Sequence, residues 1–462
     1  MTKVAKPIVA AIIVGLAIVF ARGMAEVPPA TWVAQGVRLT LGPYLQALTP
    51  ELAIACWGTD GAAAGGAVVY GTTSEYGSTA RAEQVGTVQC ARLVDLKSYT
   101  RYHYRVLQGD AALSANATFR SLAGPEQESL SLVAWGDNRT NYTIHRQLAG
   151  KVKEAAPDLV INVGDFVESG ERMSDWRVFF DAERELLANA PFYPVLGNHE
   201  QNSPLYFSLL SLPGNKRWYS FDSGPVHFVA LDVVFSDYQL GSEQYTWLEQ
   251  DLKETSRPWK IIYSHFPPYS FSAYRPGIEA VRQTLPPLFE RYGVQLVLSG
   301  HDHYYQRNQV NGLTYIVTGG GGAPLHPGAR SAVTLFTEET YHFLKISVNK
   351  DVLTSTGVRL DGSEFDPFSL LLVKAGTERQ EPPATLRSGS PVSPEPAAIS
   401  PSAEISLIER LSCLRCHRPF RLTNGQLLAY AWDYHRSAAV AGGVALASIM
   451  LALALRYARA RS

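Results

Sequence analysis

The chain has 462 residues, more than a single hydrophobic core usually holds and enough for two or three domains. Hydrophobic residues make up 46% and charged residues 18% of it, a balance typical of folded proteins that excludes a largely disordered chain. The formal net charge of -1 provides no basic field for nucleic acid and no acidic solvating tail, so we expect no nucleic-acid binding.

The N-terminus has the order of charged and apolar residues that marks a signal peptide. Lys3 and Lys6 precede a continuous apolar run over residues 7–20, and small residues follow, ending at Ala25. The run is shorter than the roughly 20 residues that a membrane-spanning helix needs. The pattern predicts a signal peptide over residues 1–25, cleaved after Ala25, with an uncleaved anchor as the alternative.

Residues 37–122 have the pattern of an all-β domain. Short runs of β-branched and aromatic residues are separated by Gly, Ser, Thr and Asp at the spacing of a β-sandwich. Residues 96–104 resemble the corner of a fibronectin type III domain, so we expect a fibronectin III-like sandwich. Cys56 and Cys90 fall on expected strands, where they form either a disulfide or two small buried hydrophobic side chains.

Residues 126–372 change to an α/β alternation. The apolar runs expected as strands are 130–135, 159–163, 192–196, 226–231, 261–263, 294–298 and 315–318. Stretches with helical periodicity lie between some of these runs, at 143–155, 174–189, 242–255 and 277–292. This alternation predicts an α/β domain with its strands in the interior.

Polar residues stand directly after five of these apolar runs. They form the blocks Gly136-Asp137, Gly164-Asp165, Gly197-Asn198-His199-Glu200, Ser264-His265 and Gly300-His301-Asp302-His303. Sites in such sheets lie beyond the carboxyl ends of the strands, so we expect these side chains to converge. Four of the blocks begin with glycine, which lets the chain turn sharply at those points.

The residue types in these blocks suit a metal site. Carboxylate, amide oxygen and imidazole are the ligands that bind Fe, Zn or Mn in proteins. A carboxylate shared by two cations about 3.5–4 Å apart allows the pair to stabilise the attacking and leaving oxygens of a phosphate ester. The blocks therefore predict a two-metal hydrolytic site.

The five blocks, in this order, resemble the calcineurin-like metallophosphoesterase superfamily. The preceding β-domain and the runs 303–307 and 319–324 are similar to its purple acid phosphatase branch, and the resemblance covers residues 37–345. It implies a four-layer α/β sandwich with two metal ions (Fe, Zn or Mn). It also implies hydrolysis of phosphate monoesters by in-line attack of metal-bound hydroxide. A phosphodiesterase acting on nucleotides or lipid head groups is the alternative.

The resemblance implies a role for each residue of the blocks. Asp137, Asp165 and His303 would bind the first metal, and Asp165, as the catalytic bridge, would also bind the second. Three residues would complete the second metal site: Asn198, His265 and His301. His199 would be the other catalytic residue, stabilising the substrate phosphate or protonating the leaving oxygen.

Two positions depart from the family pattern. Glu168 stands where purple enzymes have a tyrosine, and Arg139 stands where the wider superfamily often has a histidine. The first metal therefore lacks a ligand, which Glu168, Asn141 or water would replace. Arg139 either binds substrate phosphate through its bidentate guanidinium or forms a structural ion pair. Arg275 aligns with a substrate-binding histidine of plant members and is a second candidate for binding phosphate.

Two segments follow the α/β domain. Residues 373–404 are rich in Pro, Ser, Glu and Thr and are predicted to form a flexible linker. Residues 405–436 contain Cys413, Cys416 and His417, a Cys-X-X-Cys-His pattern that marks haem c attachment in exported proteins. A local or intermolecular disulfide is the simpler alternative for these cysteines.

Residues 437–455 form an uncharged apolar run long enough to span a membrane as a helix, with three arginines directly after it. The positive-inside rule keeps those arginines in the cytoplasm. Together with the signal peptide, this predicts an exported, membrane-anchored protein whose catalytic domain lies in the periplasm or the extracellular space. A non-catalytic surface protein or haem-bearing electron-transfer protein is the second alternative, and the oligomeric state stays open.

Overall fold

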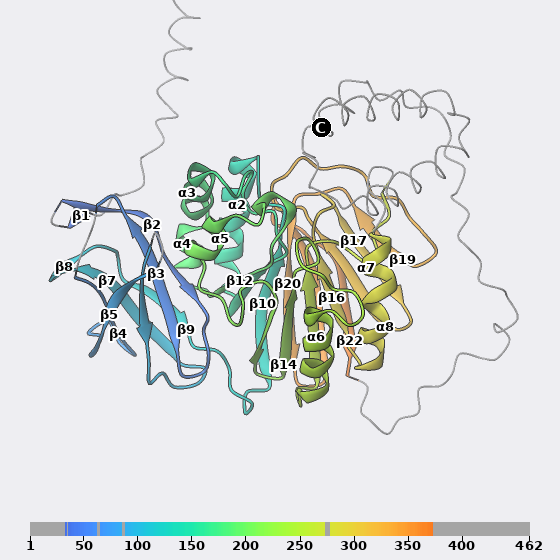
Figure 1. The fold of residues 1–462 in the computed structure, drawn as a ribbon, viewed down its shortest axis with the longest axis horizontal. Coiled ribbons are helices and arrows are strands. Elements are labelled where there is room, and N and C mark those ends of the chain that lie inside the picture. The colour runs from blue at the N-terminus through green and yellow to red at the C-terminus, as the bar shows by residue number, and fades with distance from the viewer. Residues whose placement is uncertain (1–32, 35, 62–64, 86–87, 273–277, 373–462) are drawn as a thin grey trace, which may run out of the picture. The chain divides into compact units, whose positions relative to one another are not determined.

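The computed structural model describes residues 33–34, 36–61, 65–85, 88–272 and 278–372 (Figure 1). Several expectations fall outside these residues: the signal peptide, the linker, Arg275, the segment with Cys413, Cys416 and His417, and the apolar run 437–455. Within the described part of the chain, no helix combines the length and the apolar character needed to cross a membrane.

The N-terminal strands form a nine-stranded antiparallel sheet. They are β1 (Val33–Ala34), β2 (Val37–Gln46), β3 (Ala53–Thr59), β4 (Gly66–Gly71), β5 (Ser78–Val85), β6 (Val88–Leu93), β7 (Arg101–Gln108), β8 (Ala111–Ala112) and β9 (Ala117–Arg120). Their order is β1-β2-β3-β6-β5-β4-β7-β8, and β9 also pairs with β7. The first half of β5 pairs with β4 and its second half pairs with β6, so β5 links the strands β1, β2, β3 and β6 to the strands β4, β7, β8 and β9. The expected fibronectin III-like sandwich stays a prediction.

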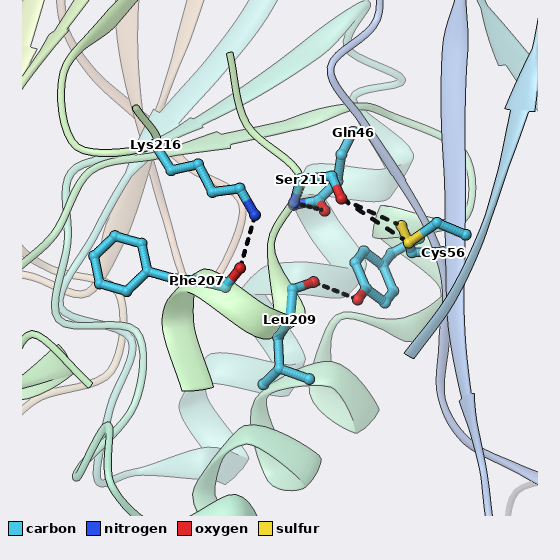
Figure 2. Close-up of a disulfide and its surroundings, with 8 residues drawn as sticks. Gln46, Cys56, Phe207, Leu209, Ser211 and Lys216 are labelled. Carbon is cyan, nitrogen blue, oxygen red and sulfur yellow. Dashed lines mark hydrogen bonds between the residues drawn. A yellow bond between two sulfur atoms is a disulfide. The ribbon is translucent and has the colours of Figure 1, made fainter. Parts of the chain in front are cut away.

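A disulfide joins two strands of this sheet. Cys56 on β3 stands directly opposite Cys90 on β6, and the two sulfurs are bonded (Figure 2). Both side chains are buried, and Ser211 Oγ lies 3.9 Å from each sulfur. Of the two alternatives for this pair, the disulfide is therefore the one found.

Two further sheets carry the α/β part. The first has the order β12-β11-β10-β20-β21-β22 and the second the order β13-β14-β15-β16-β18-β17-β19. The first sheet consists of β10 (Ser129–Trp135), β11 (Leu159–Asn162), β12 (Phe192–Pro194), β20 (His342–Asn349), β21 (Val352–Arg359) and β22 (Glu364–Leu371). The second consists of β13 (Tyr219–Ser223), β14 (Val226–Leu231), β15 (Trp259–Ser264), β16 (Leu296–Ser299), β17 (Tyr305–Val310), β18 (Leu313–Thr318) and β19 (Thr334–Glu338).

The helices lie between these strands in the sequence. They are α2 (Tyr142–Glu154), α3 (Met173–Ala182), α4 (Arg184–Leu187), the 3-10 helix η1 (Asn198–Glu200), α5 (Pro204–Leu209), α6 (Glu243–Glu254), α7 (Glu279–Thr284) and α8 (Pro286–Arg291). Serine side chains start two of them: Ser203 Oγ accepts a hydrogen bond at the beginning of α5 and Ser242 Oγ at the beginning of α6.

The alternation of side chains along the strands explains the layers. Phe228 in β14 and Ile261 in β15 belong to the core shared with the first sheet. Their neighbours Val229 and Ile262 belong to a separate cluster with residues of α6 and α8. Because successive side chains of a strand point to opposite faces, the second sheet packs against the first sheet on one face and against helices on the other. Figure 1 shows α2–α4 beside the first sheet and α6–α8 beside the second.

Parallel pairing brings several strand ends to the same edge. In the first sheet β10, β11 and β12 are parallel, and in the second sheet β14, β15, β16 and β18 are parallel. These strands are almost completely buried, as expected for parallel sheets covered on both faces. Their carboxyl ends are where the polar blocks of the sequence occur.

Buried tyrosines connect the N-terminal strands to the α/β part. Tyr44 donates a hydrogen bond from its hydroxyl to Leu209 O (2.5 Å), and Tyr104 donates one to Ala188 O (2.8 Å). Figure 2 shows Leu209, the acceptor of the first of these hydrogen bonds, near Cys56. In the opposite direction, Tyr193 of β12 donates to Leu48 O (2.8 Å). Each of the three hydroxyls is buried and donates a hydrogen bond, so no unpaired hydroxyl destabilises the contact between the N-terminal strands and the α/β part.

Candidate metal centre

The predicted ligands all lie in segments directly after parallel strands. Asp137 follows β10, Asp165 follows β11, Asn198 begins η1 after β12, His265 follows β15, and His301 and His303 follow β16. The backbone φ angles of Asp137, Asp165 and His301 are positive, at 55°, 56° and 72°. Non-glycine residues adopt this region rarely, and such residues concentrate at functional sites.

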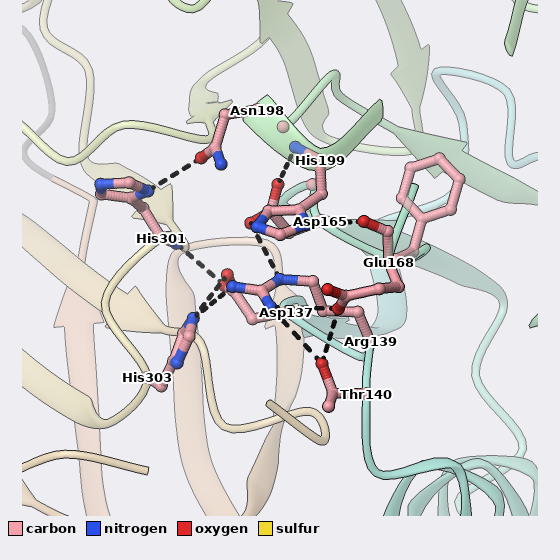
Figure 3. A network of polar contacts seen from close by, with 12 residues as sticks. Asp137, Arg139, Thr140, Asp165, Glu168, Asn198, His199, His301 and His303 are labelled. Carbon is pink, nitrogen blue, oxygen red and sulfur yellow. Dashed lines mark hydrogen bonds and ion pairs between the residues drawn. The ribbon is translucent and has the colours of Figure 1, made fainter. Parts of the chain in front are cut away.

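Four side chains meet between these segments, and Figure 3 shows three of them: Asp165, Asn198 and His301. Asn198 Oδ1 lies 3.1 Å from both His265 Nε2 and His301 Nδ1. His265 Nε2 also lies 3.3 Å from Asp165 Oδ1. We refer to these two oxygens and two nitrogens as the four-atom set. Ligand atoms of Asp137, Asp165 and His265 fall within 4.8 Å of one another, and all three residues are buried. The four-atom set is a mixed donor set that suits Zn, Mn or Fe.

Backbone groups hold two of these ligands in place. His265 Nδ1 lies 2.8 Å from Val163 O, and because a carbonyl oxygen can only accept, this nitrogen carries the hydrogen. The arrangement directs Nε2 into the four-atom set. Gly197 has no side chain beside Asp165: a Cβ atom there would lie 2.3 Å from Asp165 Oδ1. The close approach of the two segments therefore requires glycine at this position.

The charges of the site shift two pKa values. Burial alone would raise the pKa of Asp165, but His265, His199 and Arg139 together hold it well below its ordinary value. Burial alone would lower the pKa of His265, but the adjacent Asp165 carboxylate raises it to about 9. Both pKa shifts reflect the same contact, in which the Asp165 carboxylate and the His265 imidazole lie 3.3 Å apart in the buried centre.

Asp137 and His303 lie next to the four-atom set. Asp137 Oδ2 accepts the backbone N–H of His301 (2.9 Å), and Asp137 Oδ1 lies 3.5 Å from His303 Nε2. That Oδ1 atom is buried and has no hydrogen-bond partner among the described residues. A buried carboxylate oxygen without a donor is costly unless a cation or water reaches it, so this oxygen also fits a metal site. His303 Nδ1 lies 2.8 Å from Pro324 O.

Arg139 enters the site from the loop that carries Asp137 and is 4% exposed. Its Nε donates to Asp165 Oδ2 (3.3 Å), and its Nη2 lies 3.4 Å from His303 Nε2. Its Nη1 is 3.4 Å from Glu168 Oε2. Of the two roles considered for Arg139, the ion pair is therefore present in the structure, and its partner is a predicted metal ligand.

The two residues considered as replacement ligands have other contacts. Glu168 Oε2 accepts a hydrogen bond from Thr140 Oγ1 (2.7 Å) in addition to its contact with Arg139. Asn141 Oδ1 accepts the backbone N–H of Ile144 (3.3 Å) and so caps the start of α2. The side-chain oxygen of Asn141 is therefore used at a helix start, and its role as a ligand stays a prediction.

His199 lies at the edge of the centre and outside the four-atom set. Its backbone N–H donates to Asp165 Oδ1 (2.9 Å), and its Nδ1 lies 2.8 Å from Glu168 O. The carbonyl fixes the ring so that Nε2 faces Asp165 Oδ2 at 4.0 Å. With 7% of the residue exposed, this nitrogen is placed to contact a ligand that enters beside the metal position.

Glu200 has a role that the sequence did not reveal. Its carboxylate accepts backbone N–H groups from both ligand-bearing segments, at Gly197 (2.6 Å), Asp165 (2.9 Å) and Phe166 (3.0 Å). The residue is completely buried. The only signal in the sequence was an acid directly after His199 in the Gly-Asn-His-Glu block.

Comparison with known proteins concerns the same part of the chain. A model of the calcineurin-like phosphoesterase family matches residues 134–305. Purple acid phosphatase 15 of Arabidopsis thaliana is 27% identical over 293 residues, which cover 51% of this chain and 54% of the relative. Acid phosphatase type 7 of Homo sapiens is 31% identical over 219 residues, covering 41% and 50%. Another Arabidopsis thaliana relative, named probable inactive purple acid phosphatase 1, is 26% identical over 392 residues, covering 68% and 64%.

Solved structures share the fold. A purple acid phosphatase, PPD1 from Lupinus luteus, has a TM-score of 0.62 at 19% identity, covering 71% of this chain and 74% of its own. A structure of PhoD has a TM-score of 0.59 at 13% identity, covering 72% and 90%. The chain spans between half and just under two thirds of the length of the three curated relatives. Because the family model covers all five blocks, residues 134–305 of this chain form a calcineurin-like phosphoesterase domain.

Proposed function

We propose that this chain is a metal-dependent phosphoesterase that hydrolyses phosphate monoesters by in-line displacement at phosphorus. The observation that carries the proposal is the four-atom set, in which Asp165, Asn198, His265 and His301 converge from four different segments. Buried charged groups, even when they are paired, often stabilise a fold no better than apolar residues of similar size, so this donor set favours a functional role over a structural one. The relatives named as acid phosphatases support the same chemistry.

A bound metal would polarise the phosphoryl oxygens and provide a nucleophile near neutral pH. The residues of the chain supply the rest of the site. Arg139 brings a planar guanidinium, which suits the oxygens of a phosphate group. His199 faces the centre through Nε2 and is placed to hydrogen-bond a phosphoryl or leaving oxygen. Glu200 keeps the segments of Asp165 and Asn198 in register.

The test is hydrolysis of 4-nitrophenyl phosphate by the purified protein. We expect turnover that is lost after treatment with a chelator and restored by Zn, Mn or Fe. Asp165→Ala should abolish it, whereas Asp110→Ala, which removes an exposed acid in the turn between β7 and β8, should leave it unchanged. Turnover by Asp165→Ala above a few per cent of the parent rate would contradict the proposal.

The same assay separates the alternatives. A faster rate on bis(4-nitrophenyl) phosphate than on the monoester would favour a phosphodiesterase. Two relatives carry the words "probable inactive" in their names, so a non-catalytic protein is the other alternative. A protein that retains metal but hydrolyses neither substrate would support this alternative and contradict ours.

We further propose that the protein is exported and held at a membrane by residues 437–455. The charged and apolar order of residues 1–25 and the arginines after residue 455 support this placement. The disulfide between Cys56 and Cys90 supports it independently, because disulfides persist mainly outside the cytoplasm. Fractionation of cells followed by protease treatment of intact spheroplasts tests it: the domain should be membrane-bound and digested. A protected domain would show that it lies in the cytoplasm.

A further inference from the structure

The guanidinium of Arg139 occupies a particular place in the candidate metal centre. The resemblance assigns Asp165 to both metals, and it assigns His303 to the first metal. In the structure Oδ1 of Asp165 faces His265 within the four-atom set, whereas Oδ2 faces Arg139 Nε at 3.3 Å. One oxygen of the predicted bridging carboxylate is therefore already paired with a fixed positive charge (Figure 3).

Arg139 also faces His303, another predicted ligand of the first metal. His303 Nδ1 lies 2.8 Å from Pro324 O, which can only accept, so Nδ1 carries the hydrogen and Nε2 presents its lone pair. Arg139 Nη2 lies 3.4 Å from that lone pair. A guanidinium has only donors and stays protonated in proteins, so it can pair with this nitrogen but cannot act as a metal ligand.

Glu168 contributes to the same arrangement. Its carboxylate lies 3.4 Å from Arg139 Nη1 and is fixed by Thr140 Oγ1. The two departures from the family pattern therefore contact each other. Glu168 stands in the place of a metal-binding tyrosine, Arg139 stands in the place of a histidine, and the two side chains form an ion pair. A dication placed next to this buried guanidinium would meet a like charge a few ångströms away, which disfavours its binding there.

We propose that this chain holds one metal ion, bound by Asp165, Asn198, His265 and His301, and that the Arg139 guanidinium takes the place of the first metal. The inference rests on the proposed function, which it makes more specific. The centre then contains one metal ion and one guanidinium. The guanidinium would present N–H groups to the phosphoryl oxygens at the position where a two-metal enzyme has its first metal.

Metal stoichiometry tests the inference independently of activity. The full-length protein is incubated with excess Zn²⁺, Mn²⁺ or Fe²⁺, freed of unbound metal and analysed by mass spectrometry of the elements. We expect one equivalent per chain with the best-retained metal. Arg139→His, which removes the guanidinium and supplies an imidazole, should raise the value to two. Two equivalents in the parent protein, or one in a folded Arg139→His variant, would overturn the inference.

A second pair of variants locates the single metal and does not depend on the folding of Arg139→His. Asn198→Ala removes a ligand of the four-atom set and should lower retention to well below half an equivalent. His303→Ala removes a predicted ligand of the first position only and should retain one equivalent. The reverse pattern would contradict the assignment. If the parent protein retains no metal at all, the proposed function fails as well, whereas two equivalents would leave that function standing and remove only the inference.

Discussion

The carboxylate of Glu200 accepts the backbone N–H of Asp165 at 2.9 Å, so a residue of η1 fixes the loop that follows β11. The same carboxylate accepts the N–H of Gly197, at the start of its own segment. One buried acid thus joins the two loops that bring Asp165 and Asn198 together. The metal centre depends on this acid although it binds no metal in our proposal.

Glu200→Ala should therefore weaken both the fold and the metal site. Loss of hydrogen bonds to several buried N–H groups should lower the free energy of unfolding by about 3 kcal/mol, measured by urea denaturation. Metal affinity should fall on the order of 10- to 100-fold, measured by competition with a chromophoric chelator. Glu200→Gln keeps one acceptor oxygen and should lie between the parent and Glu200→Ala. Unchanged metal affinity in both variants would show that the loops need no such support.

His199→Asn should separate catalysis from metal binding. His199 lies outside the four-atom set and faces the centre only through Nε2, so the variant should retain its metal. Turnover of 4-nitrophenyl phosphate should fall on the order of 10²- to 10⁴-fold, the usual range for a residue that transfers or holds a proton in the transition state. His265→Asn is the matched control and should lose metal and turnover together. Metal loss in His199→Asn would assign it to the ligands instead.

His227 should make stability depend on pH. Burial alone would lower its pKa, but hydrogen bonds to Asp222 (2.7 Å) and Asp251 (2.8 Å) raise it to about 9. Because the folded pKa lies above the unfolded value of about 6.5, the stabilisation is complete below pH 6.5 and is lost as the pH rises through 9. His227→Gln should therefore lower the free energy of unfolding by on the order of 2 kcal/mol at pH 6.

At pH 9.5 the difference between the parent and His227→Gln should shrink to a few tenths of a kcal/mol, since the parent imidazole is then mostly neutral. Urea denaturation at the two pH values measures both differences. A difference that is equal at pH 6 and pH 9.5 would mean that packing, rather than charge, accounts for the effect of the substitution.

Reduction of the bond between Cys56 and Cys90 should destabilise the protein. The two residues are 34 positions apart, and cross-linking a loop of that length stabilises by roughly 3–4 kcal/mol through the entropy of the unfolded chain. We expect urea denaturation midpoints to fall when a thiol reductant is added. The double variant with alanine at both positions should show no such response, which controls for the cysteines at 413 and 416. A parent protein that does not respond either would contradict the prediction.

The meeting of the ligand segments could be predicted because strands and their ends leave a local signal. Asp137, Asp165 and His265 each follow a buried apolar run, and parallel strands present their carboxyl ends at one edge. Glycines before the ligands added a second local signal. None of this required knowledge of side-chain conformation, only of where each strand stops.

The orientation of individual side chains could not be predicted in the same way. Asn141 was considered only as a metal ligand, and its hydrogen bond at the start of α2 became visible only in the structure. The pairing of Arg139 with Asp165 and His303 depends on residues 26 and 164 positions away. The division of β5 into a half that pairs with β4 and a half that pairs with β6 likewise depends on pairing partners, which alternation along a single strand does not specify.

The tyrosine hydroxyls of Tyr44, Tyr104 and Tyr193 have a practical consequence for protein production. A truncated variant that begins after Arg120 would expose the carbonyls of Leu209 and Ala188 together with the apolar surface around them. Such a fragment should express poorly and aggregate, even though every metal ligand remains. Chimaeras between related enzymes should accordingly exchange the N-terminal strands and the α/β part together, or keep these three tyrosines.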